Sequence, residues 1–363
     1  MGRYIFRRKA LVLSLVLLPA CLAFSLYAAE GATHYHPLDI PGAEHHEVEK
    51  YRQQFLSPYG REWLKKILTD AEPYRRYIRR KLREENLPAC LEYLPVVESE
   101  YKPSAASKSG AKGMWQFMAN SMAPFLTKNE WVDERLDPWK STDAALAKLK
   151  DNYNMFGDWP LAIAAYNCGA GALSRIVKKS GKKTFWELTE GGLLNRQVSE
   201  YVPKFLAVAD LVRNADYYGI ELPDFESGQA ETSQSGSCDF DYVTVDSQVS
   251  LRRLASELRI DDTFLKSLNP SLLHDVTPPD TSYRLRVPQG FSESAGTALR
   301  TIKKQHPGSG CFSYTVVRGD SLWAISRRYG IKLADLCLIN GLSEKNILSV
   351  GKILYIPAKI TDK

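Results

Sequence analysis

The chain has 363 residues, of which 44% are hydrophobic and 25% are charged, and its formal net charge is +6. This length exceeds the usual size of one domain and predicts two or three folding units, with enough apolar residues for packed cores. Because basic and acidic residues are interspersed, the mild positive charge does not indicate a dedicated nucleic-acid-binding protein.

The N-terminal segment has the pattern of an export signal. Its basic start is followed by an apolar run of twenty residues, 10–29, which is the order found in secretory signals. About 20 apolar residues also suffice to span a bilayer. We therefore expect residues 1–29 to be a cleaved signal or a membrane anchor, with lipid attachment at Cys21 as a third option. In each case the rest of the chain is expected to be exported, in the periplasm or cell envelope.

Residues 51–220 are predicted to form an all-α domain. Apolar residues recur there at three- and four-residue spacing, as at Leu146 and Leu149, whereas β-branched alternation is scarce. Ser141 or Thr142 is expected to cap the helix that contains these leucines, since both residue types favour the N-cap position.

Two similar segments follow, at residues 239–290 and 312–358. Each contains a strand-like run, two helical stretches and a final apolar strand that ends in Pro. Both predict a βααβ unit, in which a two-stranded sheet lies under two helices. Three further segments are expected to be linkers, at residues 30–50, 221–238 and 291–311. The predicted fold class is therefore α+β multidomain, with an all-α domain before two small βααβ modules.

The six cysteines contain no CxxC pair and no closely spaced Cys/His set, so no metal site and no cofactor is expected. Cys90, Cys168 and Cys337 are interpreted as small apolar core residues. Cys238 and Cys311 each lie next to the start of a βααβ unit, and they could pair in an oxidising compartment.

The positions of the histidines exclude several kinds of catalytic site from the all-α domain. All six histidines lie outside residues 47–273. The domain acting alone therefore cannot hold a Ser-His-Asp triad, a Cys-His pair or a His-based zinc site. The chain also has no P-loop and no dinucleotide fingerprint. Among these kinds of catalytic site, one that acts through carboxylates remains for the all-α domain.

Glu98 is the candidate catalytic acid. It closes a predicted helix whose apolar residues Leu91, Leu94 and Val97 face a core. Partial burial would raise the pKa of its carboxyl group, as a general acid near neutral pH requires. Glu100 is a poor second carboxylate, because residues two positions apart on a helix do not share a face. A solvated surface group is the alternative interpretation of a Glu at a helix end.

The sequence after Glu98 supports the catalytic interpretation. Gly110 and Gly113 permit a tight turn that can bring Gln116 back beside Glu98. Two later runs, LAIAAYNCGAGAL and EYVPKFLAVADLV, add further polar candidates, which are Tyr166, Asn167 and Tyr201. In this order and spacing, the motifs resemble the catalytic domain of the lytic transglycosylases related to goose-type lysozyme, over roughly residues 87–216.

The resemblance implies a peptidoglycan lytic transglycosylase, a carbon–oxygen lyase with a lysozyme-like fold. Such an enzyme cleaves the β-1,4 bond between N-acetylmuramic acid and N-acetylglucosamine and leaves a 1,6-anhydromuramoyl product. Glu98 is implied as the catalytic acid and base. Substrate contacts are implied for Ser99, Gln116, Tyr166, Asn167 and Tyr201. Family members often have Glu-Thr-Arg where this chain has residues 197–199, Gln-Val-Ser, so substrate contacts or scaffolding there are expected to differ.

The second βααβ unit resembles a LysM module, through its GDSLW turn, Asn340-Gly341, Gly351 and the final Ile-Pro. LysM modules bind glycans that contain N-acetylglucosamine, such as peptidoglycan. The resemblance implies a sugar groove lined by Gly319, Asp320, Ser321, Leu322, Asn346 and Ile347. Turn and cap chemistry explains Gly319 and Asp320 equally well. The first unit lacks a GDSLW equivalent and is interpreted as a degenerate LysM-like module.

Two alternatives to a transglycosylase stay open at this point. A hydrolytic muramidase would need a second acid to hold a water molecule, and Asp137 and Asp143 are the candidates. A non-catalytic protein could use both parts of the chain only to bind peptidoglycan. In all three interpretations the expected partners are peptidoglycan glycan strands and, if the N-terminal segment is uncleaved or lipidated, the membrane, and no nucleic acid is expected.

Overall fold

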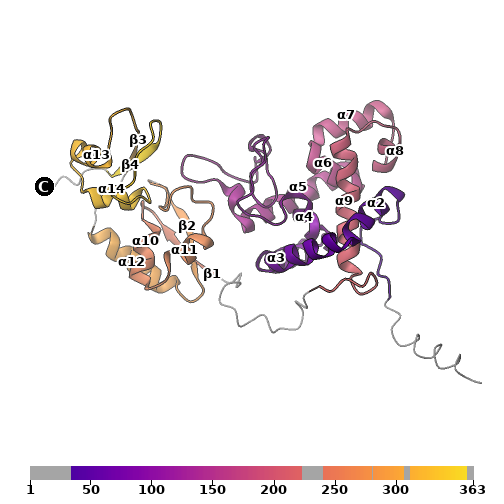
Figure 1. The fold of residues 1–363 in the computed structure, drawn as a ribbon, viewed down its shortest axis with the longest axis horizontal. Helices are drawn as coiled ribbons and strands as arrows, with labels where there is room; N and C mark the ends of the chain where they lie inside the picture. The colour runs from indigo at the N-terminus through magenta and orange to yellow at the C-terminus, as the bar shows by residue number, and fades with distance from the viewer. Residues whose placement is uncertain (1–33, 223–239, 280, 306–310, 358–363) are drawn as a thin grey trace, which may run out of the picture.

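The computed structural model describes residues 34–222, 240–279, 281–305 and 311–357. The expected signal or anchor at residues 1–29, and nearly all of the linker expected at 221–238, lie outside these ranges. Figure 1 shows an all-α domain at one end of the molecule and two small modules together at the other end. This arrangement confirms the α+β fold class.

The all-α domain is built around one buried helix. Helix α9 (Arg196–Arg213) is buried along most of its length, and it packs against α2, α4 and α6. The α-helices of this domain are α2 (His46–Leu56), α3 (Pro58–Glu84), α4 (Leu94–Ser99), α5 (Pro138–Phe156), α6 (Trp159–Cys168), α7 (Ala170–Ser180), α8 (Phe185–Glu190) and α9. Short 3₁₀ turns lie at Ala89–Tyr93, Ala119–Ser121 and Glu134–Leu136.

Both modules have the predicted βααβ order. The first comprises β1 (Phe240–Val245), α10 (Leu251–Leu258), α11 (Asp262–Leu268) and β2 (Tyr283–Pro288), and the second comprises β3 (Cys311–Thr315), α13 (Leu322–Tyr329), α14 (Leu333–Ile339) and β4 (Ile353–Pro357). In each module the two strands pair antiparallel. The predicted Cys238–Cys311 pair lies outside the described part of the chain, which includes neither Cys238 nor the side chain of Cys311.

Two of the expected linkers are wrong. Residues 34–45 lie on the all-α domain, where Ile40 is buried and the Tyr35 hydroxyl donates to Asp210 (2.7 Å). The segment expected to link the modules forms a helix, α12 (Ser292–Gln305), which packs on the first module. Apolar residues on one side of each segment are buried in these contacts, and this burial keeps the segments ordered.

The expected cap of helix α5 is also wrong. The helix begins one turn earlier, at Pro138, and the Asp137 carboxylate accepts hydrogen bonds from the backbone N–H groups of Trp139 and Lys140. The Ser141 hydroxyl instead donates to the Asp137 carbonyl group (2.6 Å). Asp137 is a strong N-cap, and Pro at the first helical position favours this earlier start.

The first module is docked on the all-α domain through residues 130–139. The Arg286 guanidinium donates to the Asp137 carboxylate (2.5 Å), and both side chains are buried. The Asp133 backbone N–H donates to the Ser271 carbonyl group (2.9 Å). Tyr355 of the second module packs against Trp131, with ring centroids 4.0 Å apart. The modules and the all-α domain therefore share a buried interface.

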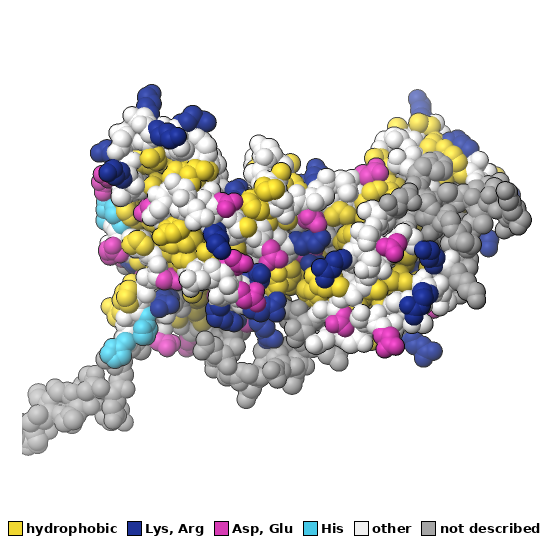
Figure 2. Space-filling model, turned by 180° about the vertical axis from the view of Figure 1, so that it is seen from behind, with side chains coloured by type: hydrophobic (Ala, Val, Ile, Leu, Met, Phe, Trp, Pro, Cys, Tyr) yellow, Lys and Arg dark blue, Asp and Glu magenta, His cyan; other side chains and the backbone are white. Residues whose placement is uncertain are grey.

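The surface agrees with the mixed charge pattern of the sequence. Figure 2 shows basic and acidic side chains interspersed over this face of the molecule, with apolar patches between them. Among the described residues, no helix has both the length and the apolar character needed to cross a membrane. Cys90 and Cys337 are buried, as expected of core residues, whereas Cys168 is only half-buried.

Candidate active site

Glu98 lies in the last turn of α4, as the sequence predicts. The helix starts with Pro95 in its first turn and ends where Glu100 adopts a left-handed conformation (φ 55°). The neighbouring Ser99 hydroxyl donates to the Met114 carbonyl group (2.7 Å), which ties α4 to the following loop. Glu98 is therefore held at the junction between a buried helix and the loop of residues 105–117.

This loop turns back on itself, as the two glycines predict. Gly113 has a φ of +82°, and a Cβ atom there would lie 1.7 Å from the Arg135 carbonyl oxygen. The Arg135 guanidinium in turn donates to the carbonyl groups of Gly110 (3.1 Å) and Phe117 (3.2 Å). Gln116 consequently returns to the side of Glu98, and its amide donates to the Gly113 carbonyl group (2.8 Å).

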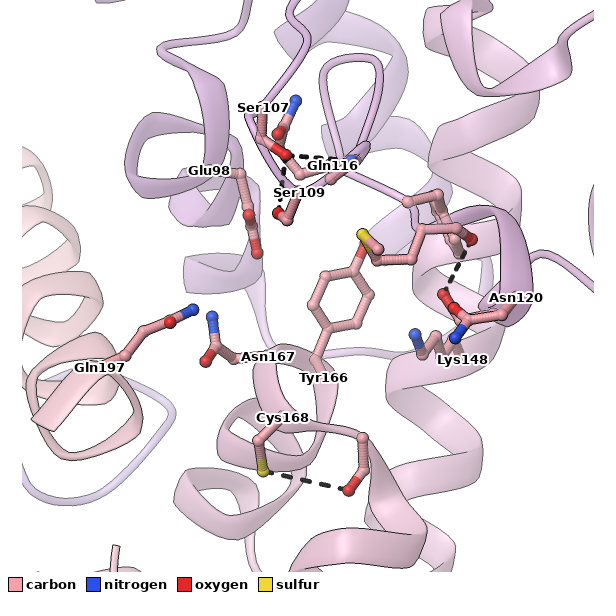
Figure 3. Close-up of a pocket in the computed structure, with 15 residues that line it drawn as sticks. Glu98, Ser107, Ser109, Gln116, Asn120, Lys148, Tyr166, Asn167, Cys168 and Gln197 are labelled. Carbon is pink, nitrogen blue, oxygen red and sulfur yellow. Dashed lines mark hydrogen bonds between the residues drawn. The ribbon is translucent and has the colours of Figure 1, made fainter. Parts of the chain in front are cut away.

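Two hollows meet at Glu98. One has a volume of about 470 Å³ and is the pocket drawn in Figure 3, with Gln116, Tyr166 and Asn167 in its wall. The other, about 540 Å³, lies toward Trp63 and contains Ser99 and Glu100 in its wall. Both volumes are typical of ligand-binding sites. A chain-like ligand that occupied both hollows would pass directly over the Glu98 carboxyl group.

The surroundings of Glu98 favour its protonated form. The side chain is half-buried, and desolvation raises the pKa of its carboxyl group to about 7, although a hydrogen bond from Tyr201 and the charge of Lys148 act in the opposite direction. The Tyr201 hydroxyl donates to Glu98 Oε1, and burial raises its own pKa well above the usual range. Glu98 can therefore hold a proton near neutral pH while it faces the pocket.

Tyr166 and Asn167 come from the C-terminal end of α6. The Tyr166 hydroxyl donates to the Trp115 carbonyl group (2.9 Å), which connects the loop of residues 105–117 to this helix. The Asn167 side chain lines the pocket, and its Oδ1 atom is buried without a hydrogen-bond partner among the described residues. A buried acceptor of this kind needs a donor, and a ligand N–H or O–H group can supply one.

Several residues of this pocket are not among those that the sequence motifs predict. Lys148 reaches it from α5 and Gln197 from α9, and Asn120 and Cys168 also line it (Figure 3). Gln197 is one of the three residues at which this chain departs from the family pattern. That departure was the sequence signal that could have indicated a substrate contact at this position. Cys168 was interpreted as a core residue, but it contributes to the pocket wall.

Neither candidate for a second acid lies in the pocket. Asp137 is buried between Arg286 and the start of α5, and Asp143 accepts hydrogen bonds from the Tyr77 hydroxyl (2.9 and 3.0 Å). Glu100 faces the second hollow, where it pairs with Lys102 (2.5 Å), an ion pair that lowers its pKa. The interpretation of Asp137 or Asp143 as a water-holding acid is therefore wrong for this structure.

The predicted glycan-binding residues of the second module have mixed surroundings. Asp320 accepts from the Tyr314 hydroxyl (2.6 Å) and from the Val317 N–H (2.9 Å), Ser321 caps α13, and Leu322 is in the module core. Gly319, Asn346 and Ile347 are exposed. Turn, cap and core roles thus explain part of the set, and Ile347 is fully available to a ligand.

Comparisons with known proteins agree with this geometry. Residues 76–189 match the family described as "Transglycosylase SLT domain". The chain therefore carries a lytic transglycosylase domain. Residues 314–357 match "LysM domain", and residues 239–304 match "Lytic transglycosylase MltD, LysM-like domain". The transglycosylase match includes Glu98, Gln116, Tyr166 and Asn167, and Tyr201 lies beyond its end.

Two curated relatives align with most of the chain. They are the proteins named "Membrane-bound lytic murein transglycosylase D" from Escherichia coli strain K12 and from Escherichia coli O6:H1. Each is 29% identical to this chain over 330 residues, which are 87% of this chain and 70% of the relative. The alignment therefore extends well beyond the transglycosylase domain.

Proposed function

We propose that the chain cleaves peptidoglycan at the β-1,4 bond between N-acetylmuramic acid and N-acetylglucosamine, with Glu98 as its acid and base. One observation carries this assignment. In a domain of the transglycosylase family, Glu98 is the carboxyl group at which both hollows meet, and its raised pKa keeps it protonated near neutral pH. A general acid needs both access and a proton.

The reaction begins with the transfer of the Glu98 proton to the glycosidic oxygen. As the bond breaks, positive charge develops at the anomeric carbon of the muramoyl residue, and the acetamido group of the substrate stabilises it. Substrate assistance of this kind replaces the second carboxylate of most glycosidases. This route suits a pocket in which neither Asp137 nor Asp143 takes part.

The Glu98 carboxylate then removes a proton from the muramoyl 6-hydroxyl group. The hydroxyl oxygen attacks the anomeric carbon and closes a 1,6-anhydro ring, so no water is consumed and Glu98 recovers its proton. Because the hydroxyl is already tethered to the sugar, its attack has a high effective molarity. The Tyr201 hydroxyl, which donates to Glu98 Oε1, stabilises the carboxylate between the two proton transfers.

Sugar positioning is assigned to the polar groups of the pocket wall. The unpartnered Asn167 Oδ1 can accept from the acetamido N–H group of a bound sugar. Gln116 lies across both hollows and can contact the two sugars on either side of the cleaved bond. The Ser99 hydroxyl is occupied by Met114, so its proposed contribution is to hold the loop in place.

The mass of the product distinguishes this reaction from hydrolysis. Purified protein without residues 1–33 is incubated with insoluble murein, and the soluble fragments are examined by mass spectrometry. We expect 1,6-anhydromuramoyl ends, whose mass is lower by one water than that of the hydrolytic product. Fragments with reducing muramoyl ends would identify a muramidase, and binding without any release of fragments would identify a non-catalytic anchor.

The Tyr201 hydroxyl is expected to set the upper pH limit of activity. Its hydrogen bond lowers the pKa of Glu98, so Tyr201→Phe should raise that pKa above about 7. Glu98 then stays protonated to higher pH, so the alkaline limb of the kcat/KM profile should move to higher pH. The activity at pH 7 should fall. The pH profile of the Tyr51→Phe variant is the control. A profile that falls in height without moving would contradict the proposed hydrogen-bond role.

The second module is proposed to hold the enzyme on peptidoglycan through its exposed loops, which include Gly319, Asn346 and Ile347. Ile347 is 97% exposed, and the side chains of Val350 and Trp323 in the same module are also exposed. Exposed apolar side chains suit contact with the apolar faces of sugars. The name of the curated relatives also supports a cell-envelope location, and we propose that residues 1–29 provide the signal or membrane anchor.

A further inference from the structure

Lys148 is a cation within the pocket that the proposed reaction does not use. It projects from α5, and its ammonium group lies 4.9 Å from the centre of the Tyr166 ring and 5.4 Å from that of Phe117. In Figure 3 the Tyr166 side chain stands between Lys148 and Glu98, and Asn120 lies beside Lys148. The two aromatic rings hold the charge at the wall of the cavity.

As far as the structure describes its surroundings, the ammonium group has no direct counter-charge. Within the described ranges, no carboxylate lies within 4 Å of it and no hydrogen bond involves it, whereas Lys102 and Lys204 at the second hollow are paired with Glu100 and Glu200. Burial lowers the pKa of Lys148, and the negative charge that acts on it is that of Glu98. Glu98 is protonated, and therefore neutral, before the reaction. The positive charge of Lys148 then faces the pocket without a negative charge to compensate it.

The chemistry of the substrate identifies a partner for this charge. N-acetylglucosamine is neutral, and the muramoyl ring carries one acidic group, the carboxyl of its lactyl ether. An attached peptide stem converts this carboxyl into a neutral amide, and removal of the stem restores the carboxylate. Other carboxylates belong to the stem itself, separated from the ring by several rotatable bonds. A cation fixed in the sugar pocket therefore distinguishes the two states of the ring.

We propose that Lys148 binds the free lactyl carboxylate of a stem-free muramoyl residue, and that the enzyme thereby prefers glycan from which peptide stems have been removed. This specificity rests on the proposed function. It also places the enzyme after a reaction of a stated class, because an amidase that cleaves the bond between the lactyl group and the stem must first supply the substrate.

Three glycans test the proposal. They are murein with uncross-linked stems, the same glycan after amidase treatment, and the amidase-treated glycan with its carboxylates converted to methyl amides. Rates are measured at pH 5.5, where Glu98 is protonated, so that any change in its pKa has little effect. We expect wild-type kcat/KM to be about tenfold higher on the stem-free carboxylate glycan than on its methyl amide, the effect of one charge-assisted contact.

Lys148→Met should lower kcat/KM more on the stem-free carboxylate glycan than on its methyl amide and so abolish this ratio, whereas Lys148→Arg should preserve part of it. Lys150→Met is the matched control, since Lys150 lies on the same helix and pairs with Glu85 (2.9 Å) away from the pocket. Equal wild-type rates on both glycans would overturn the proposal. So would an equal loss on all three substrates in Lys148→Met, because it would show that Lys148 acts through Glu98 or through packing.

A binding measurement separates this proposal from the proposed function. In the Glu98→Gln background, soluble stem-free oligosaccharides are titrated into proteins with Lys or Met at position 148, and thermal midpoints confirm that both are folded. We expect about tenfold weaker binding with Met, and none of this difference with the methyl amide. Equal affinities would overturn the assignment of Lys148 even if cleavage occurs. Failure of the wild type to cleave any glycan would overturn the proposed function alone.

Discussion

Glu98→Gln is expected to abolish the release of soluble fragments from murein. The amide keeps the shape of the side chain but has no acidic proton to transfer and no carboxylate to act as base. General acid–base groups contribute about 10²- to 10⁴-fold, and here one residue provides both functions, so we expect a loss near the upper end of that range. The rate of fragment release, followed by chromatography, is the measurement.

The variant should still sediment with insoluble murein, because the second module and the pocket wall are unchanged. Glu85→Gln is the control, since Glu85 pairs with Lys150 (2.9 Å) away from both hollows and takes no part in the proposed proton transfers. It should cleave at close to the wild-type rate. If Glu98→Gln retained the wild-type rate, another acid would have to perform the reaction.

The pH dependence of stability provides an independent check on the same residue. The folded-state pKa of Glu98, about 7, lies above its ordinary value of 4.5, so ionisation at high pH costs folding free energy. The effect is absent below pH 4.5, where the group is protonated in both states, and it is complete above pH 7. Glu98→Gln should therefore raise the free energy of unfolding by about 1–3 kcal/mol at pH 8 and leave it unchanged at pH 4. An equal shift at both pH values would contradict the raised pKa.

The sequence was sufficient to predict the centre of the site because its residues lie in strong local patterns. Glu98 ends a short apolar helix, and the loop after it contains glycines at the positions that need a positive φ. Tyr166 and Asn167 lie at the end of an apolar helix that Gly169 terminates. The two βααβ units were predictable for the same reason, since each strand and helix has its own periodicity.

What the sequence did not reveal depends on contacts between distant segments. Lys148 is one of three lysines on α5, and only the packing of this helix beside Tyr166 turns it toward the pocket. The segment at residues 34–45 and helix α12 were predicted to be linkers, and the surfaces that bury their apolar residues belong to other elements. No local pattern contains that information.

Arg286→Met is expected to cause the largest loss of stability at the interface between the first module and the transglycosylase domain. Arg286 is 3% exposed and Asp137 is fully buried, and their ion pair is the charged contact between β2 and the start of α5. Removing one partner of a buried pair leaves the other charge uncompensated, which costs about 3–5 kcal/mol. Met keeps an apolar chain over the Trp139 ring, on which the guanidinium now stacks at 4.7 Å, so loss of packing contributes little.

The interface also supports the pocket, so this substitution should reduce activity as well as stability. The Asp133 backbone N–H donates to the Ser271 carbonyl group of the module, and the Asp133 carboxylate accepts from the Arg135 guanidinium (2.8 and 2.7 Å). Arg135 in turn holds the loop that carries Gln116. Loosening the module should therefore lower kcat on soluble glycan fragments, which do not depend on the second module for binding.

Calorimetry of the protein without residues 1–33 measures the effect on stability. Arg284→Met is the control, because Arg284 lies on the same strand but is exposed. Asp137→Asn, which retains Oδ1 as the cap acceptor for Trp139 and Lys140, completes a double-mutant cycle that isolates the charge pair from the cap. A thermal unfolding midpoint for Arg286→Met equal to that of Arg284→Met would show that the buried ion pair contributes no net stability. The module would then be held by its apolar and backbone contacts alone.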